Sequence, residues 1–269
     1  MTNSVFKDKV IIITGASSGI GQELAYQLAA QGAWLSLAAR NAERLEAVRA
    51  ECQARGGKAI AIPTDVSEQT QCAGLIQQTV ENYQRIHVLV NNAGITMWAN
   101  FEDLHDPGMI EQIMRINYFG SVYCTYYALP YLKQTKGQIV GISSLTGKTG
   151  VPTRSGYAAS KHAMVGFFDS LRIEIAPYGM SVTMIYPGFV ATEVRERAFG
   201  ADGQLLGQSP VREKEVMPVE RCVQLILRAM VQRRRELVMT LRGKVGQWLK
   251  LIAPGLVDRI ALQAIKKGR

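Results

Sequence analysis

The stretch VIIITGASSGIG, residues 10–21, decides the fold class of this chain. Its first five residues are apolar or β-branched without alternation, which is typical of a strand buried on both faces of a parallel sheet. A glycine-rich turn follows immediately, and a segment with helical period begins at residue 20. Glycines in a strand-to-helix turn let the backbone approach a pyrophosphate, which the helix N-terminus attracts. The stretch therefore predicts a phosphate-binding turn made of Gly15, Ser17, Ser18, Gly19, Ile20 and Gly21.

The same alternation of strand and helix continues along the chain. Strands are expected at residues 10–14, 34–38, 58–62, 87–90, 138–142, 181–185 and 236–239, and helices at 20–31, 42–55, 68–83, 107–132, 156–176 and 219–232. This order predicts a single Rossmann-type, doubly wound α/β domain over residues 1–240, a seven-stranded and mostly parallel sheet with helices on both faces. The irregular stretch 188–217 is too long for an ordinary connection and is predicted to be a substrate loop.

Composition and charge argue against several classes of protein. The chain has 269 residues and is 47% hydrophobic, which is enough to bury a full core. Its four cysteines are widely spaced without a C-x-x-C pair, which indicates reduced thiols and no metal site. The N-terminus is polar and no apolar run approaches the roughly 20 residues of a membrane span, so we expect a cytoplasmic protein without a secretory signal. The net charge of +9 arises entirely after residue 211, which argues against nucleic acid as a partner.

The end of the second strand indicates which dinucleotide binds. A cofactor without a 2′-phosphate needs a carboxylate there for its ribose hydroxyls, whereas one with a 2′-phosphate needs a cation. Ala39 stands where the acid would be, and Arg40 follows it. Because a guanidinium can bind a phosphate with two parallel hydrogen bonds, this favours NADP(H) over NAD(H). A surface arginine near a helix start is the alternative, and the glycine turn has serines where a second basic residue often stands.

Tyr157 and Lys161 stand four residues apart in SGYAASKHAM, residues 155–164. On a helix their side chains share one face. A tyrosine ring packed over a lysine stem would explain an isolated pair of this kind. Motifs elsewhere in the chain change that interpretation.

The chain resembles the short-chain dehydrogenase/reductase family over roughly residues 8–240. The glycine turn, NNAG at 91–94, ISSLTG at 142–147, YAASK at 157–161 and PGFVAT at 187–192 follow the family's order and spacing. The stretches SSLTGK and GFFDSLR resemble the branch that contains 11β-hydroxysteroid dehydrogenase-like and other lipid-ketone reductases.

The resemblance implies further cofactor contacts and a catalytic tetrad. The implied contacts are Asp65 and Val66 at the adenine, Asn92, Ala93 and Gly94 beside the cofactor, and Pro187, Gly188, Val190 and Thr192 around the nicotinamide. The implied tetrad is Asn117, Ser144, Tyr157 and Lys161. Tyr157 would be the general acid and base, Lys161 would lower its pKa and bind the nicotinamide ribose, and Ser144 would orient the substrate oxygen. Asn117 would hold a water molecule that leads to Lys161.

The chemistry sets a requirement on Tyr157. To accept a proton near neutrality, its phenol must have a pKa lowered by roughly three units from about 10, which is about 4 kcal/mol of preferential stabilisation. A cation on the same helix face in a dry site can supply energy of that order. We therefore expect an NADP(H)-dependent oxidoreductase acting on a carbonyl or secondary alcohol. The alternative is a non-catalytic dinucleotide-binding sensor or scaffold, which needs no Tyr–Lys pair.

Substrate and oligomer are less strongly indicated. Met97, Trp98 and Phe189 could line an apolar pocket beside Ser144 and Tyr157, which favours a lipophilic ketone or alcohol over a charged metabolite. In the family, the 107–132 and 156–176 helices pair across a dimer axis, so a homo-oligomer, dimer or tetramer, is implied. An internal core explains the apolar residues of those helices equally well.

Residues 241–269 are expected to form a basic amphipathic extension. Apolar residues recur with helical spacing on both sides of Pro254, and lysines and arginines surround them. Two short helices of this kind over 244–269 suit the surface of an anionic membrane. Packing on a partner subunit, covering of the substrate pocket, and disorder are the alternatives.

Overall fold

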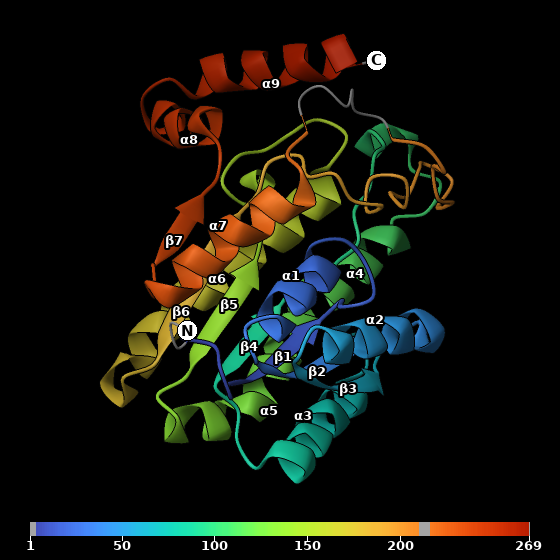
Figure 1. Ribbon diagram of the computed structural model, residues 1–269. Helices are drawn as coiled ribbons and strands as arrows, with labels where there is room; N and C mark the ends of the chain where they lie inside the picture. The colour runs from blue at the N-terminus through green and yellow to red at the C-terminus, as the bar shows by residue number, and fades with distance from the viewer. Residues whose placement is uncertain (1–3, 210–215, 269) are drawn as a thin grey trace.

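The computed structural model describes residues 4–209 and 216–268, with side chains described as far as residue 263. In this part of the chain, seven parallel strands form one sheet in the order β3-β2-β1-β4-β5-β6-β7 (Figure 1). The strands are β1 (Val10–Thr14), β2 (Trp34–Ala39), β3 (Lys58–Pro63), β4 (Val88–Asn91), β5 (Gln138–Ile142), β6 (Ser181–Tyr186) and β7 (Glu236–Val238). The predicted doubly wound fold is confirmed, and all six strand pairings are parallel.

Helices cover both faces of the sheet. The first face carries α1 (Gly19–Ala29), α2 (Ala42–Ala54) and α7 (Val219–Val231), and the second carries α3 (Gln69–Tyr83), α5 (Gly120–Gln134) and α6 (Ser155–Ile175). Ile11 and Ile13 of β1 belong to the apolar core of the first face, whereas Ile12 belongs to that of the second. Because side chains alternate across a strand, a strand covered on both faces needs apolar residues at every position.

The prediction of a single helix over residues 107–132 is wrong in one respect, because a π-helical turn interrupts the α-helix. α4 (Gly108–Met114) and α5 are joined by a π-helical turn, η2 (Arg115–Phe119), which contains Asn117. A π turn inserts one extra residue into the helical repeat and is frequent at functional sites. Three short 3₁₀ helices are also present in the described residues: η1 (Phe101–Asp103), η3 (Leu145–Gly147) and η4 (Ala176–Tyr178).

The predicted substrate loop, residues 188–217, leaves β6 at the carboxyl edge of the sheet, and its residues 210–215 lie outside the described part of the chain. Backbone bridges hold the rest of the loop. Val190 pairs with Met217, and Phe199 pairs with Met97 and with Leu205. The loop is therefore attached to the segment that follows β4.

α8 (Leu241–Ile252) and α9 (Pro254–Gly268) form the end of the chain, beyond β7 (Figure 1). Thr240, at the predicted domain boundary, caps α8 by accepting a hydrogen bond from the N–H of Gly243 at 3.0 Å. A Cβ added to Gly243 would overlap the side chain of Leu145, so α8 begins against the turn that carries Ser144. Among the described helices, none is both long enough and apolar enough to pass through a bilayer.

Candidate active site

The carboxyl ends of β1, β4, β5 and β6 lie at one edge of the sheet. β1 sits between β2 and β4, so the strand order reverses there, and open α/β sheets bind ligands at such a switch point. Gly15, Asn92, Ser143 and Pro187 each follow one of these strands directly or after one residue. The fold therefore brings motifs that are far apart in the sequence to one place.

The turn between β1 and α1 has no space for side chains. Gly15 has a φ of +65°, and a Cβ added to it would lie 2.8 Å from the Cα of Ala93. A Cβ on Gly21 would overlap the carbonyl oxygen of Gly15. Ser18, the N-cap of α1, makes no side-chain capping hydrogen bond. The N–H groups of the first turn of α1 thus have no side-chain cap, as a phosphate-binding helix N-terminus requires.

Asn92 and Ala93 connect the glycine turn to the end of β4. The Asn92 Nδ2 donates hydrogen bonds to the carbonyl oxygens of Thr14 and Gly15, at 2.9 and 3.1 Å. The Thr14 hydroxyl accepts from the backbone N–H groups of Asn92 and Ala93, at 3.0 and 3.1 Å. The Asn92 side chain therefore holds the shape of the turn. Gly94 is exposed, and a Cβ on it would lie 3.5 Å from the Lys161 Nζ.

Arg40 directly follows β2 and is exposed. Within the described part of the chain its guanidinium has no hydrogen bond or ion pair, whereas Arg44, in the first turn of α2, pairs with Glu193 of the substrate loop at 2.9 Å. Beyond β3, the Asp65 carboxylate accepts hydrogen bonds from Ser67, and Val66 is buried. The Arg40 guanidinium is thus exposed at the carboxyl end of β2, without a partner in the described residues.

Ser144, Tyr157 and Lys161 come together at the end of β5. Ser144 is close enough to the Tyr157 phenol to lower the pKa of Tyr157, and its hydroxyl accepts a hydrogen bond from the N–H of Thr146 at 3.2 Å. The Lys161 ammonium lies 5.8 Å from the centroid of the Tyr157 ring and donates to the carbonyl oxygen of Ile142 at 2.9 Å. Lys161 is only 4% exposed. The structure thus places a buried ammonium near the Tyr157 phenol, with Ser144 next to the same phenol.

Burial decides the protonation of this group. Burial raises the pKa of the Tyr157 phenol, while the guanidinium of Arg154 and the Ser144 side chain lower it. Burial also lowers the pKa of Lys161 to about 8. The resemblance implies that Lys161 lowers the phenol pKa, but here Arg154 is the cation with that effect on Tyr157. The phenol is protonated at neutral pH, which is the state that carbonyl reduction needs.

Asn117 is fully buried in the π turn, and its side-chain amide is fully engaged. Its Oδ1 accepts from the N–H of Ile95 at 2.8 Å, and its Nδ2 donates to the carbonyl of Ile95 at 3.0 Å and to the Ser160 hydroxyl at 2.9 Å. These bonds join the segment after β4 to α6, one residue before Lys161. The backbone carbonyl of Asn117 accepts a further hydrogen bond from the Ser121 hydroxyl at 2.9 Å.

The segment after β6 contacts both halves of the site. The carbonyl of Pro187 accepts from the N–H of Leu145 at 3.0 Å, next to Ser144. The side chain of Thr192 lies over the glycine turn, since a Cβ on Gly19 would come within 3.1 Å of it. Gly188 lies against Thr240, and Val190 is buried. The four residues of this segment thus follow β6 at the carboxyl edge of the sheet.

Residues 9–202 match the family model described as short chain dehydrogenase. That match covers more than half of the chain and includes the glycine turn, Ser144, Tyr157 and Lys161. The chain belongs to the short-chain dehydrogenase family.

Curated relatives of this dehydrogenase agree with the predicted branch. The 11-beta-hydroxysteroid dehydrogenase-like 4A of Arabidopsis thaliana is 44% identical over 183 residues, 68% of this chain and 61% of that relative, so the match spans less than two thirds of the relative's length. The dehydrogenase/reductase SDR family protein 7-like of Dictyostelium discoideum is 35% identical and covers 98% of this chain and 85% of that protein.

A solved structure supports the fold assignment of the dehydrogenase. The alcohol dehydrogenase from the archaeon Thermococcus sibiricus, complexed with 5-hydroxy-NADP, superposes with a TM-score of 0.75 at 26% identity, over 86% of this chain and 95% of that one. Short-chain dehydrogenases bind a nicotinamide dinucleotide, and the glycine turn and the uncapped α1 of this chain fit its pyrophosphate.

The substrate side of the dehydrogenase differs in part from the sequence interpretation. Met97 is fully buried in a small apolar core, against which Tyr157 packs, so it presents no surface to a substrate. Trp98 is half-buried and Phe189 is 37% exposed. Both lie near Arg154, a buried residue that sequence reasoning missed. The only sequence signal was a basic residue three positions before Tyr157, and nothing in the sequence predicts its burial.

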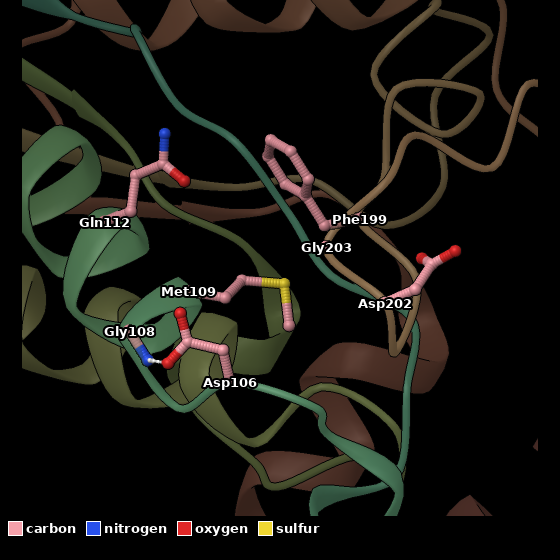
Figure 2. Close-up of a pocket in the computed structure, with 7 residues that line it drawn as sticks. All are labelled: Asp106, Gly108, Met109, Gln112, Phe199, Asp202 and Gly203. Atoms are coloured by element: carbon pink, nitrogen blue, oxygen red, sulfur yellow. Dashed lines mark hydrogen bonds between the residues drawn. The ribbon is translucent and has the colours of Figure 1, made fainter.

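A pocket of about 360 Å³ lies between the start of α4 and the substrate loop (Figure 2). Its lining residues are Asp106, Gly108, Met109, Gln112, Phe199, Asp202 and Gly203. None of the four tetrad residues lines it. Met109 and Phe199 belong to the same small apolar core that Tyr157 packs against, so the pocket is a neighbour of the reaction site.

Proposed function

We propose that this dehydrogenase is an NADP(H)-dependent oxidoreductase that acts on a lipophilic ketone or secondary alcohol. The observation that carries the proposal is the buried Lys161 ammonium 5.8 Å from the centroid of the Tyr157 ring, with Ser144 next to the phenol, at the edge of the sheet that fits the cofactor. A non-catalytic sensor or scaffold gains nothing from burying a lysine without a carboxylate partner, because burial of a charge costs free energy.

The chain's own residues perform the acid–base part of the reaction. The bound nicotinamide supplies the hydride in reduction. Tyr157 donates its phenolic proton to the carbonyl oxygen on which negative charge develops. Ser144 donates a hydrogen bond to the same oxygen and holds it beside the phenol. Lys161 would contact the nicotinamide ribose and provide a cation near the phenolate that remains.

NADP(H) is proposed over NAD(H) because of the end of β2. The position for a ribose-binding acid is Ala39, and the exposed Arg40 beside it has no partner within residues 4–209 and 216–268. The remaining candidate contacts stand as proposed from the sequence, with Asp65 and Val66 at the adenine. We also propose a cytoplasmic location.

Arg40→Asp is expected to lower kcat/KM with NADPH by about 100-fold, because a bidentate charge-assisted contact is replaced by repulsion of the 2′-phosphate. The preference should move toward NADH. The measurement is the oxidation of NADPH and NADH, in parallel, against a panel of lipophilic ketones.

Arg55→Asp is the matched control, because Arg55 is an exposed arginine at the other end of α2. It should leave the cofactor preference unchanged. An Arg40→Asp enzyme that still prefers NADPH would show that other residues recognise the phosphate. Absence of turnover by the wild-type protein with every ketone and both cofactors would favour the sensor or scaffold.

We propose a homo-oligomer that forms through the outer faces of α5 and α6. Phe119, Tyr126 and Ile173 on the π turn and these helices are 41%, 68% and 73% exposed. Phe119 stacks on Tyr123 in the same surface. An apolar aromatic surface of this kind is typical of subunit interfaces.

We further propose that α8 and α9 contact an anionic membrane surface. α8 has no buried residue, and Trp248, Leu251 and Ile252 are 66%, 76% and 84% exposed. Arg242, Lys244 and Lys250 accompany them on the same helix. A helix surface with exposed apolar residues, lysine and arginine is more stable at the interface of an anionic bilayer than in water. The amphipathic extension was predicted to run to residue 269, and its side chains beyond residue 263 lie outside the described part of the structure.

Leu251→Asp combined with Ile252→Asp is expected to weaken binding to vesicles by at least about tenfold, since each buried aliphatic side chain contributes about 1.5–3 kcal/mol. The measurement is cosedimentation with phosphatidylcholine vesicles, with and without phosphatidylserine. Phe101→Asp, at an exposed site outside the extension, is the control. Equal sedimentation of the wild-type and doubly substituted proteins would rule out this contact.

A further inference from the structure

Arg154 is a buried cation enclosed by aromatic rings at the reaction site. It is 8% exposed. Its guanidinium carbon lies 4.3 Å from the centroid of the Trp98 ring, 5.7 Å from that of Phe189 and 5.8 Å from that of Tyr157. Trp98 and Phe189 are the residues that the sequence assigned to the substrate, and Tyr157 is the proposed proton donor. The cation therefore lies where a substrate would contact the protein.

This guanidinium has no protein partner in the described part of the chain. Its Nε is buried without a hydrogen bond, and no carboxylate pairs with it. By contrast, Arg172, a partly buried arginine of α6, pairs with Asp169. Contact with aromatic faces stabilises a cation by less than the burial of an unpaired charge costs. The folded protein alone thus leaves the burial of Arg154 unfavourable.

The backbone next to Arg154 is held in a strained conformation. Thr153 has a φ of +68°, which is uncommon for any residue but glycine and is a genuine outlier for a β-branched one. Its carbonyl accepts a hydrogen bond from the N–H of Ala99 at 3.0 Å, which fixes this turn beside Trp98. Such strain persists where the surrounding structure imposes it, and it is concentrated at functional sites. Here the strained residue, Thr153, immediately precedes Arg154, which is the N-cap of α6.

We infer that Arg154 binds a carboxylate of the substrate, close to the carbonyl group that Tyr157 protonates. This inference rests on the proposed reductase function and narrows its substrate class to an apolar molecule that carries a keto acid or the corresponding hydroxy acid. A guanidinium offers two parallel N–H donors that match the two oxygens of a carboxylate. The faces of Trp98 and Phe189 would contact the apolar body of the same molecule.

The test compares an apolar keto acid with its methyl ester, which has the same ketone but no charge. Wild-type enzyme with NADPH should show at least about tenfold higher kcat/KM for the acid. In Arg154→Met the ratio of kcat/KM for acid to ester should fall by about 100-fold, because the carboxylate loses its partner. Arg154→Lys should restore part of the ratio, since it keeps the charge but not the bidentate geometry.

Binding without turnover separates this inference from the proposed function. The probe is a saturated carboxylic acid of the same length, titrated into the protein with NADP⁺ while the emission of Trp98 is followed in a variant with Trp34 and Trp248 replaced by Phe. Saturable quenching that is lost in Arg154→Met supports the inference even if no ketone is reduced.

Turnover of the ester without any binding of the carboxylic acid would support the proposed reductase function and overturn the inference. Equal losses for acid and ester in Arg154→Met would overturn it as well, because Arg154 would then act on Tyr157 alone. If Arg154→Met does not fold, a wild-type preference for the ester decides against the carboxylate site.

Discussion

Tyr157→Phe is expected to lower kcat/KM for ketone reduction by about 10³-fold, within the range of 10²–10⁴ that general acid catalysis contributes. The substitution removes only the hydroxyl group that lies near Ser144 and would protonate the substrate oxygen. The ring, which packs against the small core containing Met97, stays. Cofactor affinity should therefore change little. The measurement combines steady-state kinetics with NADPH binding followed by fluorescence.

Tyr178→Phe is the matched control for this substitution. Tyr178 is 48% exposed at the end of α6, where its ring contacts the Lys133 ammonium. Its hydroxyl has no role in the proposed reaction, so kcat/KM should stay within about twofold of the wild-type value. A Tyr157→Phe enzyme that keeps wild-type turnover would exclude Tyr157 as the proton donor. Ser144, the other hydroxyl of the pair, would then be the group to examine.

Lys161→Met should reduce kcat/KM by at least about 100-fold, because it removes the cation beside the reacting groups and the contact proposed for the nicotinamide ribose. It should also change the pH dependence of stability. Burial lowers the pKa of Lys161 to about 8 from its ordinary value of 10.5, so the unfolded chain binds more protons than the folded one between these values. The cost of burying the charge is fully present below about pH 8 and disappears as the pH rises through this window.

The stability of the wild type relative to Lys161→Met should therefore increase by about 3 kcal/mol from pH 7 to about pH 10.5, since each pKa unit corresponds to about 1.36 kcal/mol. Urea unfolding of both proteins across this range measures the difference, in which other titrating groups cancel. Lys58→Met, at an exposed site on the edge strand β3, is the control and should show no such increase. A pH-independent difference for Lys161→Met would mean that Lys161 is not desolvated as the structure indicates.

Some features of the site follow from short-range patterns. The apolar run of β1 indicates burial on both faces, and it predicted the sheet. The glycine turn after it and the helical period from residue 20 indicate local backbone geometry, and they predicted the phosphate-binding turn. The Tyr157–Lys161 spacing predicted a shared helix face, and both side chains lie beside Ser144. The sheet and the shared helix face could be predicted because each depends on residues within one strand or helix, whereas phosphate binding by the turn stays a prediction.

Other features depend on contacts between distant segments. The π turn at Asn117 accompanies hydrogen bonds to Ile95 and Ser160, which periodicity within residues 107–132 cannot reveal. The sequence predicted that Met97 lines a pocket. In the structure Met97 is fully buried, and Phe199 of the substrate loop pairs with it.

The amino-acid sequence by itself determined the doubly wound fold, the family, and the tyrosine, serine and lysine at the sheet edge. Only the tertiary structure decided that Arg154 is buried without a partner among Trp98, Tyr157 and Phe189. The physical reason is that burial and charge pairing are properties of what surrounds a side chain, and three separate segments of the chain supply that surrounding here. The local sequence around an arginine in a turn is the same whether its side chain is exposed to water or buried among aromatic rings.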